Sequence, residues 1–272
     1  ARKLAFGLLP PLAAYIALAL LLGWVVAFCV NLLQTKNLYT MRSEKMLYIS
    51  GGVLAKKAYS LLADDISFVD IRQSMVTKLL RLYSVFINAV GFGKERSDIT
   101  ALIPFSRQDK TYKNLKKILP EYMPQKPTLR PNPRRVFPFL LLPATLLFFI
   151  FLLTETFCRI FPYWETILRF SSLFMYAPAI WFLAVRFIAL FTSGLSYRNR
   201  YYTFCYSRRF YLHTVVVSSA HISAIEVRQN PFQRRSGLCT LYIYNRAEKR
   251  TVHILRGLSK NACLAMFEIS DA

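Results

Sequence analysis

The stretch Ile66-Ser-Phe-Val-Asp-Ile-Arg-Gln73 occurs a second time as Ile222-Ser-Ala-Ile-Glu-Val-Arg-Gln229. Both copies follow one pattern: isoleucine, serine, any residue, apolar, acidic, apolar, arginine and glutamine. Apolar and polar residues alternate with a period of two, which is typical of a half-buried β-strand. The recurrence predicts an internal duplication, in which each of two β-rich units contains this strand.

Further strand-like segments surround both copies. Gly51-Gly52 lies between two apolar runs and predicts a tight hairpin turn. Tyr39-Thr40 and Tyr202-Thr203 each precede a further tyrosine at the same spacing, so we take them as a second anchor and expect the second unit to be shorter between its anchors. The other predicted strands are 38–42, 45–50, 53–61, 84–92 and 99–104 in the first unit, and 201–206, 209–217, 239–244 and 250–255 in the second.

Each unit is expected to end in a helix. The segment 109–119 places Tyr112 and Leu115 on one face, with lysines largely on another. In the second unit, Ser259 is a candidate N-cap for a helix over 259–267. Several short antiparallel strands followed by one amphipathic helix predict an α+β domain, built as a small barrel or bent sandwich with a C-terminal helix.

Three apolar blocks are long enough to cross a bilayer, which takes roughly 20 helical residues. The short aromatic segment between the last two has the composition of a hairpin turn at a membrane interface. The predicted organisation, in chain order, is a span over 4–33, a β-rich domain over 36–123, a proline-rich linker over 124–135, a span over 136–157, an extracytoplasmic turn over 158–166, a span over 167–193 and a second β-rich domain over 197–270.

Basic residues are concentrated outside the spans. The formal charge is +22, although the mean hydropathy is positive at +0.31. Region 34–135 holds nineteen Lys and Arg against eight Asp and Glu, and region 194–272 holds twelve against four. Two spans separate these regions, so both lie on one side, and the positive-inside rule makes that side cytoplasmic. We therefore expect a multi-pass protein of the cell membrane whose basic surface faces the lipid bilayer and not nucleic acid.

The sequence contains no motif of a known catalytic centre, cofactor or metal site. The five cysteines are odd in number and lack CxxC spacing, and the histidines have no ligand spacing. Asp64-Asp65 is either a pair of functional carboxylates or a loop before the next strand, and the loop is the simpler interpretation. We therefore expect a non-enzymatic protein without a cofactor.

The repeated Arg-Gln pairs are the first candidate site. Arg72 and Arg228 have the chemistry to bind a phosphate headgroup or a partner's carboxylate. Alternatively, these arginines and the adjacent Gln73 and Gln229 tie the loop after the strand through backbone hydrogen bonds. The structural alternative is favoured, because a feature present in both copies fits a requirement of the fold.

Three further arginines are candidates for contact with lipid or for a role in the membrane. Arg234 and Arg235 form a basic pair suited to anionic lipid. Arg186 falls inside the last predicted span, where a charge marks a functional site unless the side chain reaches the membrane surface. Its place near the end of that span favours the second interpretation.

The segment 222–235, with Asn-Pro-Phe-Gln-Arg-Arg after the repeated strand, resembles the bacterial pleckstrin-homology-like (bPH) domain. Segment 83–93, Tyr-Ser-Val-Phe-Ile-Asn-Ala-Val-Gly-Phe-Gly, fits the same resemblance. The alternation of membrane hairpins with such domains resembles the YdbT-type bacterial membrane proteins, of which this chain would be the C-terminal portion. The resemblance implies a PH-like domain with a seven-stranded bent sheet capped by a C-terminal helix, present twice.

The same resemblance implies a role in envelope stress or in resistance to antimicrobial peptides, beside a smaller membrane partner of the YdbS type. We expect a membrane scaffold whose PH-like domains contact each other, a partner protein or further copies. The alternative is a transporter or exporter of peptide or lipid, or its accessory subunit, with Arg186 on the path. An intramembrane enzyme is the weakest alternative, because the spans lack paired ionisable residues.

Overall fold

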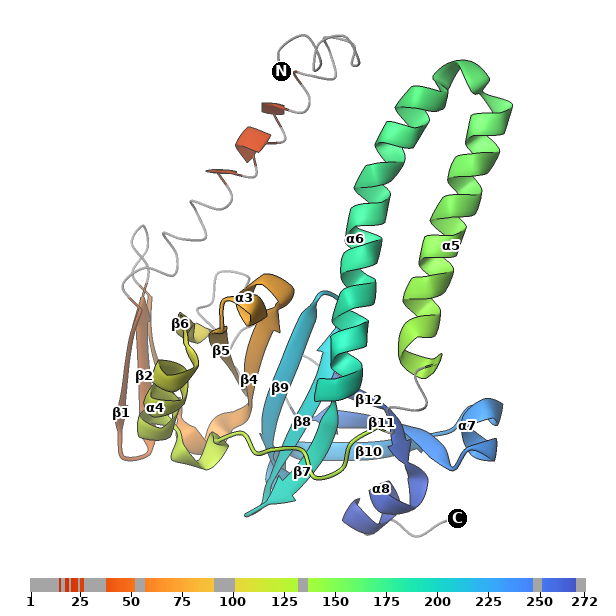
Figure 1. Cartoon of the computed structure of the whole chain (residues 1–272). Helices are drawn as coiled ribbons and strands as arrows, with labels where there is room; N and C mark the ends of the chain where they lie inside the picture. Colours follow the sequence, from red (N-terminus) through yellow and green to blue (C-terminus); the bar gives the residue numbers. More distant parts are fainter. Residues whose placement is uncertain are drawn as a thin grey trace.

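The computed structural model describes residues 38–51, 57–90, 101–131, 137–246 and 251–267, together with isolated helical positions between 15 and 26. Within these residues the chain is a mixed α+β protein, in which two β-rich domains lie side by side and a long helical hairpin rises from the second (Figure 1). Most of the predicted span over 4–33 lies outside the described residues.

The first domain contains two three-stranded antiparallel meanders followed by a helix. The first meander consists of β1 (Tyr39–Ser43), β2 (Met46–Gly51) and β3 (Lys57–Leu62). After the 3-10 turn η1 (Ala63–Asp65), the second meander consists of β4 (Ile66–Ser74), β5 (Leu82–Ala89) and β6 (Ala101–Arg107). The short helix α3 (Met75–Leu79) lies between β4 and β5, and α4 (Gln108–Ile118) follows β6, ahead of the 3-10 turn η2 (Pro120–Tyr122).

The second domain repeats this order of elements. Its strands are β7 (Gly194–Arg198), β8 (Tyr201–Arg208), β9 (Tyr211–Ser218), β10 (Ile222–Arg228), β11 (Leu238–Asn245) and β12 (Val252–Ser259). Its helical elements are η4 (Ser219–His221), α7 (Pro231–Arg235) and α8 (Lys260–Phe267). Each domain thus has six strands among the described residues, where the resemblance implied seven.

The matching order of elements corrects the predicted second anchor. Tyr39 lies in β1, the first strand of its domain, whereas Tyr202 lies in β8, the second strand. The counterpart of β1 is β7, which begins at Gly194, three residues before the predicted start of the second domain. The predicted shortening of the second domain is therefore wrong. It arose because the span and β7 are separated only by Ser193.

Strands from both domains form one continuous sheet. β4 and β9 pair antiparallel from Phe68–Val217 to Ser74–Tyr211, which creates a six-stranded sheet in the order β6-β5-β4-β9-β8-β7. The remaining meanders form two separate sheets, β1-β2-β3 and β10-β11-β12. Both hydrophobic cores cross the β4–β9 seam, because Val216 belongs to the core of the first domain and Phe68 to that of the second.

The helical hairpin consists of α5 (Phe137–Ile160) and α6 (Glu165–Thr192), joined by the 3-10 turn η3 (Pro162–Trp164). Both arms, Leu140–Ile160 and Pro162–Thr192, are long and apolar enough to cross a membrane. The turn is shorter than the predicted 158–166, because the residues up to Ile160 continue α5. Arg169 near the tip is paired with Glu165 at 2.9 Å and lies 3.7 Å from Glu155.

The linker between the domains runs along β7 before it reaches the hairpin (Figure 1). Leu129 forms an isolated antiparallel bridge with Leu195. The approach is so close that a Cβ at Gly194 would lie 2.5 Å from the Cβ of Pro127 and 2.7 Å from the carbonyl oxygen of Leu129. Glycine is required at this point because any side chain would push the linker away from β7.

Candidate functional site

The two glutamines of the repeated motif have the same environment. The Gln73 amide donates a hydrogen bond to the carbonyl oxygen of Leu82 at 3.0 Å, and the Gln229 amide donates to that of Leu238 at 2.6 Å. Each bond ties the end of one strand to the start of the next, across the short helix between them. This is the geometry that the structural alternative predicts for the glutamines.

The two arginines also repeat one arrangement, but they differ in exposure. Arg72 is paired with Asp70, and Arg228 with Glu226. Each guanidinium lies over an aromatic ring of the next strand, 4.3 Å and 4.5 Å from the ring centroid. The carboxylate of Asp70 is only 5% exposed, whereas that of Glu226 is 40% exposed. One copy of the motif is therefore enclosed, and the other lies open at the surface.

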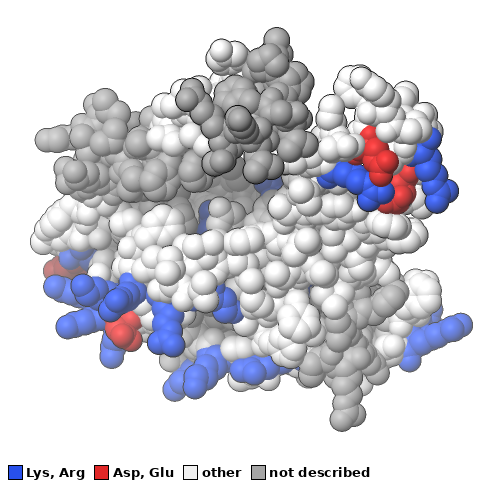
Figure 2. Space-filling view, turned by 45° about the horizontal axis from the view of Figure 1, so that its top comes forward, with Lys and Arg blue, Asp and Glu red and all other residues white. Residues whose placement is uncertain are grey.

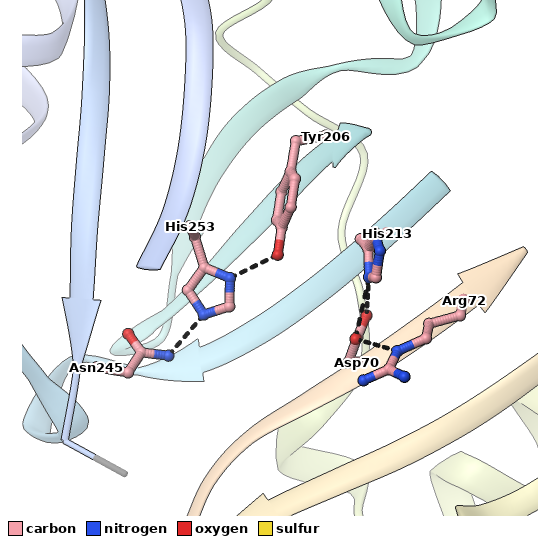
Figure 3. A network of polar contacts seen from close by, with 6 residues as sticks. All are labelled: Asp70, Arg72, Tyr206, His213, Asn245 and His253. Carbon is pink, nitrogen blue, oxygen red and sulfur yellow. Dashed lines mark hydrogen bonds and ion pairs between the residues drawn. The ribbon is translucent and has the colours of Figure 1, made fainter. Parts of the chain in front are cut away.

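Strand β9 encloses the first copy. Both carboxylate oxygens of Asp70 lie 3.1 Å from Nδ1 of His213 (Figure 3). Burial alone would raise the pKa of Asp70, but the hydrogen bonds and charges of His213 and Arg72 outweigh it and hold the pKa below the usual 3.8. Asp70 is therefore an ionised group inside the seam between the domains. No local signal could have revealed this, because Asp70 and His213 are 143 residues apart.

A second cluster of polar side chains, Tyr206, Asn245 and His253, lies in the second domain beside the seam (Figure 3). The Tyr206 ring stacks on His213 at 5.3 Å between centroids, and its hydroxyl lies 2.7 Å from Nδ1 of His253. The Asn245 amide lies 2.9 Å from Nε2 of His253. Burial lowers the pKa of His253 to about 4, so the ring is neutral. The Asn245 amide N–H donates to Nε2, and since a neutral imidazole has one N–H, Nδ1–H donates to the hydroxyl oxygen of Tyr206.

The polar groups of the seam are bonded to one another, and the described residues contain no group of three or more His, Cys, Asp or Glu that could hold a metal ion. Asp64 and Asp65, the other candidate carboxylates, lie in the 3-10 turn before β4. We therefore assign the network a structural role: it fastens one domain to the other.

Arg186 lies near the end of α6 that meets the second domain. Its Nη1 atom is 3.3 Å from the hydroxyl oxygen of Ser207 and 3.4 Å from the carbonyl oxygen of the same residue. The guanidinium also lies 5.1 Å from the centroid of the Phe182 ring. Beside it is a cavity of about 140 Å³, lined by Arg186, Tyr206, Ser207, Arg208, Val252, Ile254 and Arg256.

The structure brings Arg186 together with two arginines that the sequence analysis did not single out. Arg208 ends β8 and Arg256 lies within β12, so only the fold places them beside α6. Arg234 and Arg235 are both exposed on α7. A capping box starts α7, in which the Asn230 N–H donates to the Gln233 side chain at 3.0 Å, and the three-residue spacing of Asn230 and Gln233 is the sequence signal for it.

These features define a membrane protein that contains a bacterial PH domain. Residues 4–118 match the family described as "Bacterial PH domain", which confirms the predicted resemblance for the first domain. The chain as a whole is distantly similar to the UPF0699 transmembrane protein YdbT of Bacillus subtilis (strain 168). The two are 24% identical over 261 residues, which cover 87% of this chain and 52% of YdbT. The chain thus spans about half the length of this curated relative. No solved structure matches the chain.

Proposed function

We propose that the chain is a membrane-anchored scaffold whose PH-like domains face the cytoplasm and assemble edge to edge with further copies. The β4–β9 seam carries this proposal, because it joins two copies of one domain through strands that are not equivalent. The counterpart of β9 in the first domain is β3, and the counterpart of β4 in the second domain is β10. The surfaces that form the seam therefore exist a second time, at the two ends of the molecule.

Both counterpart strands are edges among the described residues, since β3 pairs with β2 alone and β10 with β11 alone. The first six residues of β4 are buried, whereas no residue of β10 is. Unpaired edge strands present N–H and C=O groups that template pairing with another chain. A head-to-tail contact of this kind closes into a ring or continues as a filament.

The register of the seam predicts which residues would meet. Arg72 of β4 is directly opposite His213 of β9, and the Asp70 carboxylate bonds to that histidine. In the same register, Arg228 of β10 would be opposite Lys57 of β3 in the next copy. Lys57 would then take the register position of His213, beside the position of Glu226, which corresponds to Asp70. In this arrangement the one carboxylate, Glu226, stands next to two basic residues, Arg228 of its own strand and Lys57 of the next copy.

The distribution of charge supports a cytoplasmic location for the domains. Lys and Arg gather along the domains, whereas acidic and basic residues occur together at the hairpin tip (Figure 2). The tip carries the pairs of Arg169 with Glu155 and Glu165, so its basic residues are partly neutralised. Because the positive-inside rule counts basic residues near the ends of spans, this distribution favours the cytoplasm for the domain side.

The oligomeric state of the full chain in lipid nanodiscs, measured by mass photometry over a range of concentrations, tests the proposal. We expect oligomers that Glu226→Lys weakens at least tenfold and that the double variant Glu226→Lys, Lys57→Glu restores. Glu44→Lys makes the same change of charge in the β1–β2 turn and should leave assembly unchanged. A chain that stays monomeric, or oligomers indifferent to Glu226→Lys, would refute edge-to-edge assembly.

A smaller partner of the YdbS type is the alternative occupant of the same two edges, and co-purification from native membranes would reveal it. A role in envelope stress or peptide resistance stays a prediction from the resemblance, tested by the sensitivity of a strain that lacks the protein. Transport through the hairpin has no comparable support among the described residues, because Arg186 bonds to Ser207 of the domain.

A further inference from the structure

Arg186 lies at the depth of the lipid headgroups. Sixteen uncharged residues separate it from Arg169 along α6. At a rise of about 1.5 Å per residue this segment is roughly 25 Å long, close to the ~30 Å thickness of the hydrocarbon core. Beyond Arg186, Ala189 and Leu190 are buried in a cluster with Leu212 of β9. The helix therefore leaves the bilayer at about Arg186 and continues against the protein.

Other elements at this level present apolar side chains to their surroundings. Met75 of α3 packs against the cluster at the end of α6. The ring of Phe210, in the β8–β9 turn, lies edge-on to the Phe182 ring with 6.1 Å between the ring centroids. Helix α3 and the residue that follows it carry Leu79, 84% exposed, and Leu80, 58% exposed. Exposed apolar residues beside membrane spans suit the boundary between headgroups and acyl chains. This edge of both domains therefore lies on the membrane surface.

The cavity beside Arg186 is lined by three arginines, Arg186, Arg208 and Arg256. No carboxylate lines it, and within the described part of the chain none of the three has an ion-pair partner. The buried Nε of Arg186 has no hydrogen-bond partner there either. Asp70, the acidic group of the nearby seam, already pairs with His213. Three cations without a carboxylate form a site for an anion.

The shape and chemistry of the cavity fit a phosphate group. Its volume of about 140 Å³ is similar to that of an engineered protein cavity of roughly 150 Å³ that holds benzene, so a phosphate fits inside it. Guanidinium groups bind phosphate oxygens through paired hydrogen bonds. We propose that the pocket of Arg186, Arg208 and Arg256 binds the phosphate headgroup of an anionic phospholipid of the leaflet on the domain side.

Native mass spectrometry of the full chain in detergent, titrated with phosphatidylglycerol or with zwitterionic phosphatidylethanolamine, tests this proposal. We expect the wild-type chain to retain phosphatidylglycerol preferentially. Each of Arg208→Gln and Arg256→Gln should weaken that retention about fivefold, the change that corresponds to roughly 1 kcal/mol per basic residue at a membrane surface. These two residues are preferred to Arg186, whose replacement also removes the contacts with Ser207.

Arg198→Gln is the matched control, since Arg198 is at the end of β7 remote from α6 and outside the pocket. Its lipid retention should equal that of the wild type, and all variants should unfold at the wild-type temperature. Equal retention of the two lipids, or pocket variants that retain phosphatidylglycerol like Arg198→Gln, would overturn the proposal. Inorganic phosphate that displaces phosphatidylglycerol at equal concentration would overturn the assignment to lipid in favour of a free phosphate.

Discussion

Replacement of Asp70 by asparagine tests how the two domains are held together. The carboxylate is 5% exposed, lies 3.1 Å from Nδ1 of His213 and pairs with Arg72. Asparagine has nearly the same shape but no charge, so Asp70→Asn leaves Arg72 without its counter-charge and removes the carboxylate that bonds to His213. Glu226→Gln makes the equivalent change in the second domain, where the same ion pair lies open to solvent. The two variants therefore differ mainly in burial.

The stability lost in Asp70→Asn depends on how exposed the side chains of Asp70 and Arg72 are. Removal of one member of a buried ion pair costs about 3–5 kcal/mol, because the other charge stays buried and unpaired. The Arg72 side chain is 41% exposed and partly screened by solvent, so the lower end of that range applies. We expect Asp70→Asn to lower the free energy of opening the seam by about 3 kcal/mol, which corresponds to roughly a hundredfold faster amide exchange.

Hydrogen exchange of the β4 and β9 amides, measured on the full chain in nanodiscs, reports the free energy of opening the seam. Glu226→Gln should leave the exchange of β4 and β9 unchanged. Because the pKa of Asp70 lies below 3.8, its contribution is complete at neutral pH and is lost as the pH falls below about 3.8. Wild type and variant should converge in that acid range. If the β4 amides exchange equally slowly in Asp70→Asn and in Glu226→Gln at pH 7, the structural role of the Asp70–His213 pair is refuted.

Two further predictions concern the second domain and the linker. Because burial lowers the pKa of His253 from 6.5 to about 4, the unfolded chain binds a proton in this interval that the folded chain does not. The free energy of unfolding should therefore fall as the pH decreases from 6.5 to 4, by up to roughly 3 kcal/mol, and His253→Gln should flatten the curve; parallel curves would contradict this. Gly194→Ala places a methyl group 2.5 Å from Pro127 and should destabilise the protein by about 1–3 kcal/mol in thermal unfolding, whereas Gly23→Ala, with nothing within 4 Å, should be tolerated.

The sequence predicted the duplication because each copy keeps its own local pattern. Alternation over Ile66–Ser74 and Ile222–Arg228 identified both strands, and the two glutamines of the motif occupy equivalent positions. Long apolar blocks identified the hairpin for the same reason, since a span depends only on its own composition. The ends of these elements have no such pattern, and β7 was placed too late because only Ser193 separates it from α6.

The seam could not be predicted, because it depends on pairing between distant strands. β4 and β10 carry the same motif, yet β4 is central in a sheet and β10 lies at an edge. The difference lies in β9, which provides His213 where β3 has Lys57. The arginine pocket was missed for a similar reason. Arg208 and Arg256 belong to strands far apart in sequence, and only the packing of α6 brings them beside Arg186.

The position of the hairpin between β4 and β9 links the folding of the protein to its insertion. β4 is made first, and its edge stays unpaired until α5, α6 and β9 have been synthesised. At translation rates of about 5–20 residues per second, the 143 residues from Asp70 to His213 take roughly 7–30 s. β9 can reach β4 only if both arms cross the bilayer and return the chain to its starting side. A molecule with one failed crossing would keep an open sheet edge, so quality control in the membrane could recognise incorrect topology as incomplete folding.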